Sequence, residues 1–114
     1  MEDRFAQFHP RLLQREAELV TDLERFDDRQ PDVAEVQDVG DRAATNYNKD
    51  EMLDRIARDR GQLVLVRDAL HRGEQGEFGA CRNCGRQIEG PRLEAVPWTP
   101  YCVACQELAD RGEL

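Results

Sequence analysis

Residues 81–105 read CRNCGRQIEGPRLEAVPWTPYCVAC and contain all four cysteines of the chain. The cysteines form two Cys-x-x-Cys pairs, Cys81 with Cys84 and Cys102 with Cys105, separated by seventeen residues. A two-residue gap lets both thiolates of a pair turn toward one ion, and a second pair completes a tetrahedron. Gly85 follows the first pair, where the backbone of such a knuckle must turn sharply. The spacing therefore predicts a four-cysteine zinc site.

Two disulfides, or four unrelated thiols, are the alternatives to a metal site. Disulfides are typical of secreted proteins, but the chain begins with the charged stretch Met-Glu-Asp-Arg-Phe and no apolar run follows it. The longest aliphatic run, residues 63–66, is far too short to cross a membrane. We therefore expect a cytoplasmic protein that makes no membrane contact. A closed four-thiolate site leaves no position for a substrate, so one structural Zn²⁺ is predicted.

Composition and charge narrow the class of function. Of the 114 residues, 35% are charged and 39% hydrophobic, which suits exposed helices better than a large core. The 24 acidic and 16 basic residues give a net charge of −8, which a phosphate backbone would repel. Direct binding of DNA is not expected. The sequence shows no Ser/His/Asp set, phosphate loop or paired buried acids, so we do not expect an enzyme.

The first part of the chain has the periodicity of a long helix. Apolar residues repeat every seven positions at Phe5, Leu12, Leu19 and Phe26. Three further apolar residues widen this stripe, namely Leu13, Val20 and Leu23. Proline is favoured in the first turn of a helix, so the regular helix is predicted to start at Pro10. Gln30-Pro31 should end it, because a residue before proline avoids helical geometry.

A second helix is predicted from about Asp41 to Arg72. Its apolar positions are Met52, Ile56, Leu63, Val66 and Leu70. Gly61 lies inside this segment and should cost about 1 kcal/mol relative to alanine, and Gly73 with Gly76 should stop the helix. Two such helices satisfy their apolar stripes most simply against each other. The predicted fold is mainly α: an antiparallel coiled-coil hairpin over residues 1–74, then a zinc-finger module with a short C-terminal helix over 75–114.

The connection between the two helices is strongly acidic. Between residues 27 and 41 it holds six carboxylates against the single base Arg29, namely Asp27, Asp28, Asp32, Glu35, Asp38 and Asp41. Asp41 precedes a helical stretch and is a good candidate N-cap. Capping together with solvated surface charge is one interpretation of this cluster. An acidic functional tip at the end of a hairpin is the other.

Two motifs resemble the DksA/TraR family of transcription factors. Asp38-Val-Gly-Asp41-Arg-Ala43-Ala44 is similar to the Asp-x-x-Asp-x-Ala tip of that family. The segment from Phe78 to Cys105 is similar to its zinc finger almost position for position. The separation between the two motifs also matches, and the resemblance covers approximately residues 38–110. The chain resembles a short, DksA-like member of this family.

The resemblance implies a function. Family members bind bacterial RNA polymerase directly without binding DNA, insert the coiled coil through the secondary channel, and alter initiation with the acidic tip. By position, Asp38, Asp41 and Ala43 would be the tip residues, and Arg58 would contact the polymerase. We expect the protein to be a monomer.

The resemblance also concerns guanosine tetraphosphate, the alarmone of the stringent response. Larger members bind it with basic residues near the finger. The matching positions here are Leu65, Val96 and Gln106, none of which is charged. This argues against that alarmone site, unless nearby Arg67 or Arg92 substitutes.

Two other classes of function fit the residues. The first is a coiled-coil adaptor whose structural zinc knob serves a partner outside transcription. The second is a thiol-based sensor in which oxidation ejects zinc, with Arg82 and Arg86 close to the thiolates in the sequence.

Overall fold

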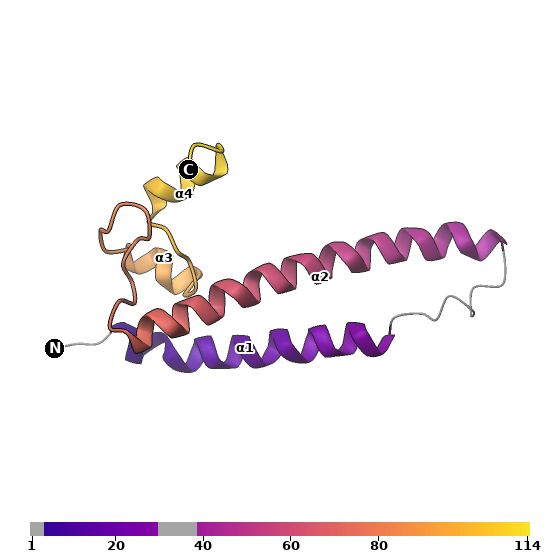
Figure 1. Cartoon of the computed structure of the whole chain (residues 1–114), viewed down its shortest axis with the longest axis horizontal. Coiled ribbons are helices and arrows are strands. Elements are labelled where there is room, and N and C mark those ends of the chain that lie inside the picture. The colour runs from indigo at the N-terminus through magenta and orange to yellow at the C-terminus, as the bar shows by residue number, and fades with distance from the viewer. Residues whose placement is uncertain (1–3, 30–38) are drawn as a thin grey trace. The chain divides into compact units, whose positions relative to one another are not determined.

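The computed structural model describes residues 4–29 and 39–114, with side chains for residues 4–26 and 49–114. These described ranges contain four helices, α1 (Arg4–Arg29), α2 (Val39–Glu74), α3 (Gly90–Ala95) and α4 (Val103–Asp110) (Figure 1). Within the described ranges there is no β-strand, and a single bridge joins Ala80 to Gln87. The fold is mainly helical, as the sequence predicts. No helix in these ranges is long and apolar enough to span a membrane.

The helix α1 begins six residues before the predicted start. It runs from Arg4 and contains Pro10 in its interior, so the prediction that Pro10 opens the helix is wrong. An interior proline removes one backbone hydrogen bond and crowds the carbonyl one turn earlier. Aromatic packing stabilises the turn before it: Phe5 stacks on the His9 ring at 4.5 Å between centroids and lies 5.6 Å from the Phe78 ring.

The helix α2 also differs from its prediction at both ends. Because it begins at Val39, Asp41 lies inside the first turn and is not the N-cap. At the other end the helix includes Gly73, and Gly76 is the residue that terminates it. Gly76 has φ +75°, and the Glu77 N–H donates to the Arg72 carbonyl over 2.8 Å. These features form a Schellman-type end, in which glycine adopts the left-handed conformation without strain.

The close approach of Phe5 explains why the helix passes through Gly73. A Cβ atom at residue 73 would overlap the Phe5 ring, so only glycine lets the aromatic side chain lie against α2. Gly61 is different, because nothing lies within 4 Å of the position its Cβ would occupy. Gly61 and Gly73 therefore have different structural roles.

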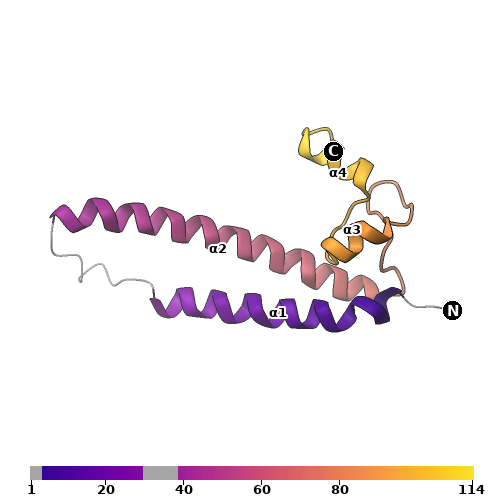
Figure 2. The same cartoon turned by 180° about the vertical axis from the view of Figure 1, so that it is seen from behind.

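The chain divides into two compact units, residues 1–16 with 64–114, and residues 17–63. In each unit a part of α1 lies beside a part of α2 and runs antiparallel to it (Figures 1 and 2). The first unit buries Phe8, Leu12, Val66, Ala69 and Leu70 of these helices. The second buries Leu19 and Ile56. The hairpin prediction is confirmed, and the division of the sequence after residue 74 stays a prediction.

The predicted apolar stripe is right at its centre and wrong at one edge. Leu12 and Leu19 are fully buried, whereas Leu13 is 46% exposed. Phe8, absent from the seven-residue repeat, is 3% exposed because its ring packs against Phe78 at 5.9 Å. The finger thus adds an aromatic contact that changes which side of α1 is covered in the first unit.

Candidate metal centre

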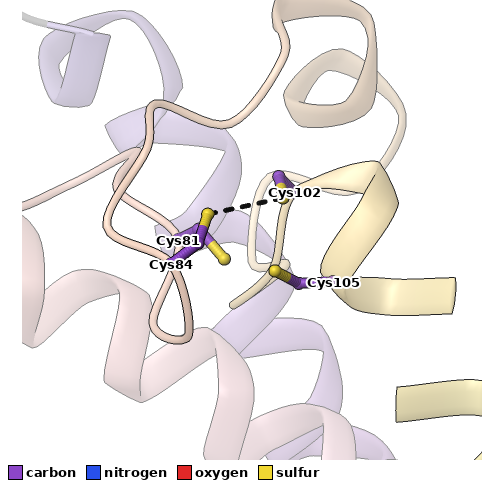
Figure 3. Close-up of side chains that lie close together, drawn as sticks. All are labelled: Cys81, Cys84, Cys102 and Cys105. Atoms are coloured by element: carbon purple, nitrogen blue, oxygen red, sulfur yellow. Dashed lines mark hydrogen bonds between the residues drawn. The ribbon is translucent and has the colours of Figure 1, made fainter. Parts of the chain in front are cut away.

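The four cysteine sulfurs converge on one point. The Sγ atoms of Cys81, Cys84, Cys102 and Cys105 all lie within 4.8 Å of one another and are turned toward each other (Figure 3). The Cys84 and Cys102 sulfurs are 3.8 Å apart and are not bonded, since all four cysteines are free. A tetrahedron with Zn–S bonds of about 2.3 Å places its sulfurs about 3.8 Å apart. The geometry suits zinc and rules out the predicted alternative of paired disulfides in this structure.

Local backbone structure brings each pair into position. After the first pair, Gly85 adopts φ +79° and its N–H donates to the Cys81 carbonyl over 3.0 Å, as the predicted knuckle requires. The second pair lies at the start of α4, with Cys102 at the N-cap and Cys105 on the first turn. Arg82 N–H donates to the Pro100 carbonyl over 2.8 Å and joins the two halves of the finger.

The electrostatics of the cluster favour a bound cation. Burial opposes ionisation of Cys81, but backbone N–H groups, including that of Cys84, outweigh it and lower the pKa of the Cys81 thiol to about 6. Asn83 favours the Cys105 thiolate, yet burial and the neighbouring thiols raise the pKa of Cys105 to about 12. One thiolate forms readily and then opposes the next. A divalent cation offsets this repulsion and holds all four groups as thiolates.

Two polar side chains outside the ligand set support the site. The Asn83 amide donates to the Cys105 sulfur over 3.3 Å. Glu89 accepts the Val103 N–H over 3.1 Å and so caps the first turn of α4. Hydrogen bonds from its own backbone N–H and from Val103 lower the pKa of Glu89 below its ordinary value. Sequence reasoning missed both residues, because a cap that lies fourteen positions away has no local pattern.

Arginines of α1 attach the finger to the hairpin within the first unit. Arg4 donates to the Ile88 carbonyl over 2.5 Å, and Arg11 donates to the Glu94 carbonyl over 2.9 Å. The Arg15 guanidinium lies 5.9 Å from the Trp98 ring centroid, a cation–π contact. Arg82 of the finger forms an ion pair with Asp68 of α2, with 2.7 Å between guanidinium nitrogen and carboxylate oxygen. Arg82, which the thiol-sensor hypothesis placed near the thiolates, is thus held in an ion pair.

The other residues singled out from the sequence belong to several elements: Arg58 and Leu65 to α2, Val96 to the end of α3, and Gln106 to α4. Asp38 and the side chains of Asp41 and Ala43 lie outside the described part of the structure, and Arg58 is exposed. Leu65, Val96 and Gln106 are half-buried. The roles predicted for the tip residues and for Arg58 stay predictions.

Known proteins share this combination of hairpin and finger. The prokaryotic dksA/traR C4-type zinc finger family matches residues 76–111. The chain is 33% identical over 84 residues to the RNA polymerase-binding transcription factor DksA of Escherichia coli K12, covering 74% of this chain and 56% of that protein. This chain therefore spans little more than half the length of that relative.

Two solved structures match nearly the whole chain. Transcription factor DksA2 of Pseudomonas aeruginosa superposes with a TM-score of 0.80 at 25% identity, covering 98% of this chain and 87% of that one. The DnaK suppressor protein of Agrobacterium tumefaciens C58 matches with a TM-score of 0.64 at 30% identity, covering 94% and 95%.

Fold and site together define a helical-hairpin protein with a four-cysteine finger. The chain belongs to the DksA/TraR family. Its four cysteines hold one structural zinc ion, because the C4-type finger and the converging sulfurs agree on the same ligands. With four protein ligands the ion has no open position, so its contribution is to fold the finger.

Proposed function

We propose that this protein is a transcription regulator that binds bacterial RNA polymerase directly through the secondary channel. The observation that carries the proposal is the match of hairpin and finger together, over 98% of the chain, to transcription factor DksA2. In this proposal the helical hairpin enters the channel, and the tip residues Asp38, Asp41 and Ala43 approach the active centre. There the tip modulates initiation in the cytoplasm, without catalysis by the protein itself.

Charge supports a protein partner and argues against DNA as the direct target. Residues 17–63 hold 13 acidic and 7 basic residues, a net charge of −6 out of −8 for the whole chain. A negative unit of this kind is repelled by a DNA backbone and attracted by a basic passage in a protein. We propose that the monomer acts on polymerase and not on promoter DNA.

We further propose that the effect does not depend on guanosine tetraphosphate. Arg67 pairs with Glu16 at 3.0 Å, and Arg92 donates to Gln106 over 3.1 Å. At about 100° per residue, Arg67 lies about 160° around α2 from Leu65. Arg67 is therefore paired with Glu16 and lies away from Leu65, whereas Arg92 lies against Gln106 and supplies one cation where the larger members use several. In vitro transcription with polymerase lacking other alarmone sites should show the same regulation with and without the nucleotide.

Binding to purified core polymerase tests the main proposal. Wild-type protein should bind the core enzyme, and a second protein occupying the secondary channel should displace it. In transcription from a responsive promoter, the bound protein should change the lifetime of the open complex. A wild-type protein that stays folded and zinc-loaded but does not bind core polymerase would refute the proposal. That result would favour the adaptor, whose partner lies outside transcription.

A further inference from the structure

The second unit contains a groove that the proposed tip mechanism does not use. Asp22, Arg25 and Phe26 of α1 and Arg55 of α2 line it, and its volume is about 150 Å³. All four residues belong to residues 17–63, so the groove lies within one compact unit. It carries two guanidinium groups against one carboxylate, in a unit whose net charge is strongly negative. The groove is therefore a locally positive site within a negatively charged unit.

The two arginines are available to a ligand. Both side chains are exposed, and among the residues with described side chains neither makes an ion pair, even with the nearby Asp22. The Arg55 guanidinium lies 5.5 Å from the centroid of the half-buried Phe26 ring. Stacking of this kind limits the movement of the guanidinium while leaving its edge donors free. A planar group with free donors is suited to bind a carboxylate through two hydrogen bonds.

The position of the groove on α2 indicates its partner. At about 100° per residue, Arg55 lies about 60° around the helix from Arg58. The family resemblance places a polymerase contact at Arg58. Arg60 lies about 140° from Arg55 and about 160° from Arg58, on another side of the same helix. The groove therefore extends the Arg58 side of the hairpin onto α1.

We propose that Arg25 and Arg55 form a carboxylate clamp that binds an acidic side chain of RNA polymerase. This inference rests on the proposed function and adds a contact surface to it. The clamp supplies affinity and fixes the rotational orientation of the hairpin, because its two arginines come from different helices. The acidic tip supplies the effect on initiation.

Binding to core polymerase with matched variants tests the clamp. Arg25→Ala and Arg55→Ala should each weaken binding by about tenfold at low salt, the expected loss for one charge-assisted contact. The double variant should lose more, and the losses should shrink at high salt because these charges are exposed. Arg60→Ala removes the same charge from an exposed position of α2 and should bind as wild type does. Far-ultraviolet circular dichroism checks that every variant is folded.

The outcomes separate this inference from the proposed function. If wild-type protein binds polymerase and the Arg25→Ala, Arg55→Ala double variant binds as tightly as Arg60→Ala, the clamp is refuted and the proposed function stands. If wild-type protein does not bind at all, both fail. Sedimentation of the free chain tests a second copy as the occupant: self-association that the double variant abolishes, with polymerase binding unchanged, would overturn the clamp.

Discussion

At the scale of single residues, the four cysteines of the finger bind the metal, and other side chains hold the cysteines in place. Cys81, Cys102 and Cys105 are buried, whereas Cys84 is exposed. Replacing Cys84 therefore removes a ligand without leaving a cavity in the core. The apolar residues between the two cysteine pairs are few, so the metal must supply much of the folding free energy of this module.

Cys84→Ser should lose the zinc ion and the ordered finger. We expect metal analysis to fall from one zinc per chain to well below one, and limited proteolysis to cleave the C-terminal region. Most of the helical circular dichroism signal should survive, because the hairpin has its own buried residues. Ala104→Ser, an exposed non-ligand position between the second pair, is the control and should retain zinc. A metal-free Cys84→Ser chain with a protease-resistant finger would contradict this prediction.

Glu89 should slow the release of zinc in a pH-dependent way. Its pKa is lowered below the ordinary value of 4.5, so its stabilising effect is present above that pH and lost as the pH falls through the lowered value. Glu89→Ala should release zinc to a chelator faster than wild type at neutral pH. The comparison is made at neutral pH, where the carboxylate is ionised and the thiolates hold the zinc ion. Glu107→Ala, exposed on the same helix α4, should behave as wild type; equal release rates for Glu89→Ala would refute the role of the cap.

At the scale of elements, α2 is one continuous helix in which Gly61 and Gly73 have unlike surroundings. Gly61 has open space around it, while Gly73 faces the Phe5 ring. Glycine lowers helix stability wherever it stands, because it has the greatest backbone freedom to lose. Only at Gly73 does a tertiary contact require the missing side chain.

Alanine substitutions at these two glycines should have opposite effects. Gly61→Ala should raise the free energy of unfolding by up to about 1 kcal/mol, the difference in helix propensity. Gly73→Ala should lower it, because the new methyl group must displace Phe5 and its contacts with His9 and Phe78. Urea unfolding of the zinc-loaded proteins measures both. Stabilisation by both substitutions would mean that the Phe5 contact is not maintained in solution.

At the scale of the whole molecule, the cysteine ligands and the proposed tip residues lie in separate parts of the sequence, and we propose separate tasks for them. The finger contains the metal, and residues 17–63 carry most of the negative charge. A helix-terminal carboxylate such as Asp41 contributes only about 0.3–1 kcal/mol through the helix dipole. The acidic residues of the connection are therefore expected to matter for activity more than for stability.

Asp38→Asn combined with Asp41→Asn should leave the fold and polymerase binding intact and abolish the effect on initiation. The measurements are binding to core polymerase and open-complex lifetime at a responsive promoter. Asp50→Asn with Glu51→Gln removes the same charge from exposed positions on α2 and should regulate as wild type does. Wild-type regulation by the tip variant would refute the tip mechanism. It would leave the zinc site unaffected.

Short-range patterns in the sequence determined the main elements and the metal site. Ligand spacing within each cysteine pair is a local property, so Cys81, Cys84, Cys102 and Cys105 could be predicted with their chemistry. Helical periodicity likewise predicted the burial of Leu12, Leu19, Ile56 and Val66. Such signals depend on residues a few positions apart, and tertiary packing did not override them here.

The tertiary structure alone decided the features that depend on distant partners. Phe5 and Phe8 packing on Phe78 accounts for a helix that continues through Pro10, and the Phe5 ring accounts for Gly73 inside α2. Glu89 caps α4, and Arg25 of α1 lines the same groove as Arg55 of α2, only because folding brings these segments together. Propensity and spacing describe neighbours along the chain, whereas these contacts join residues far apart in it.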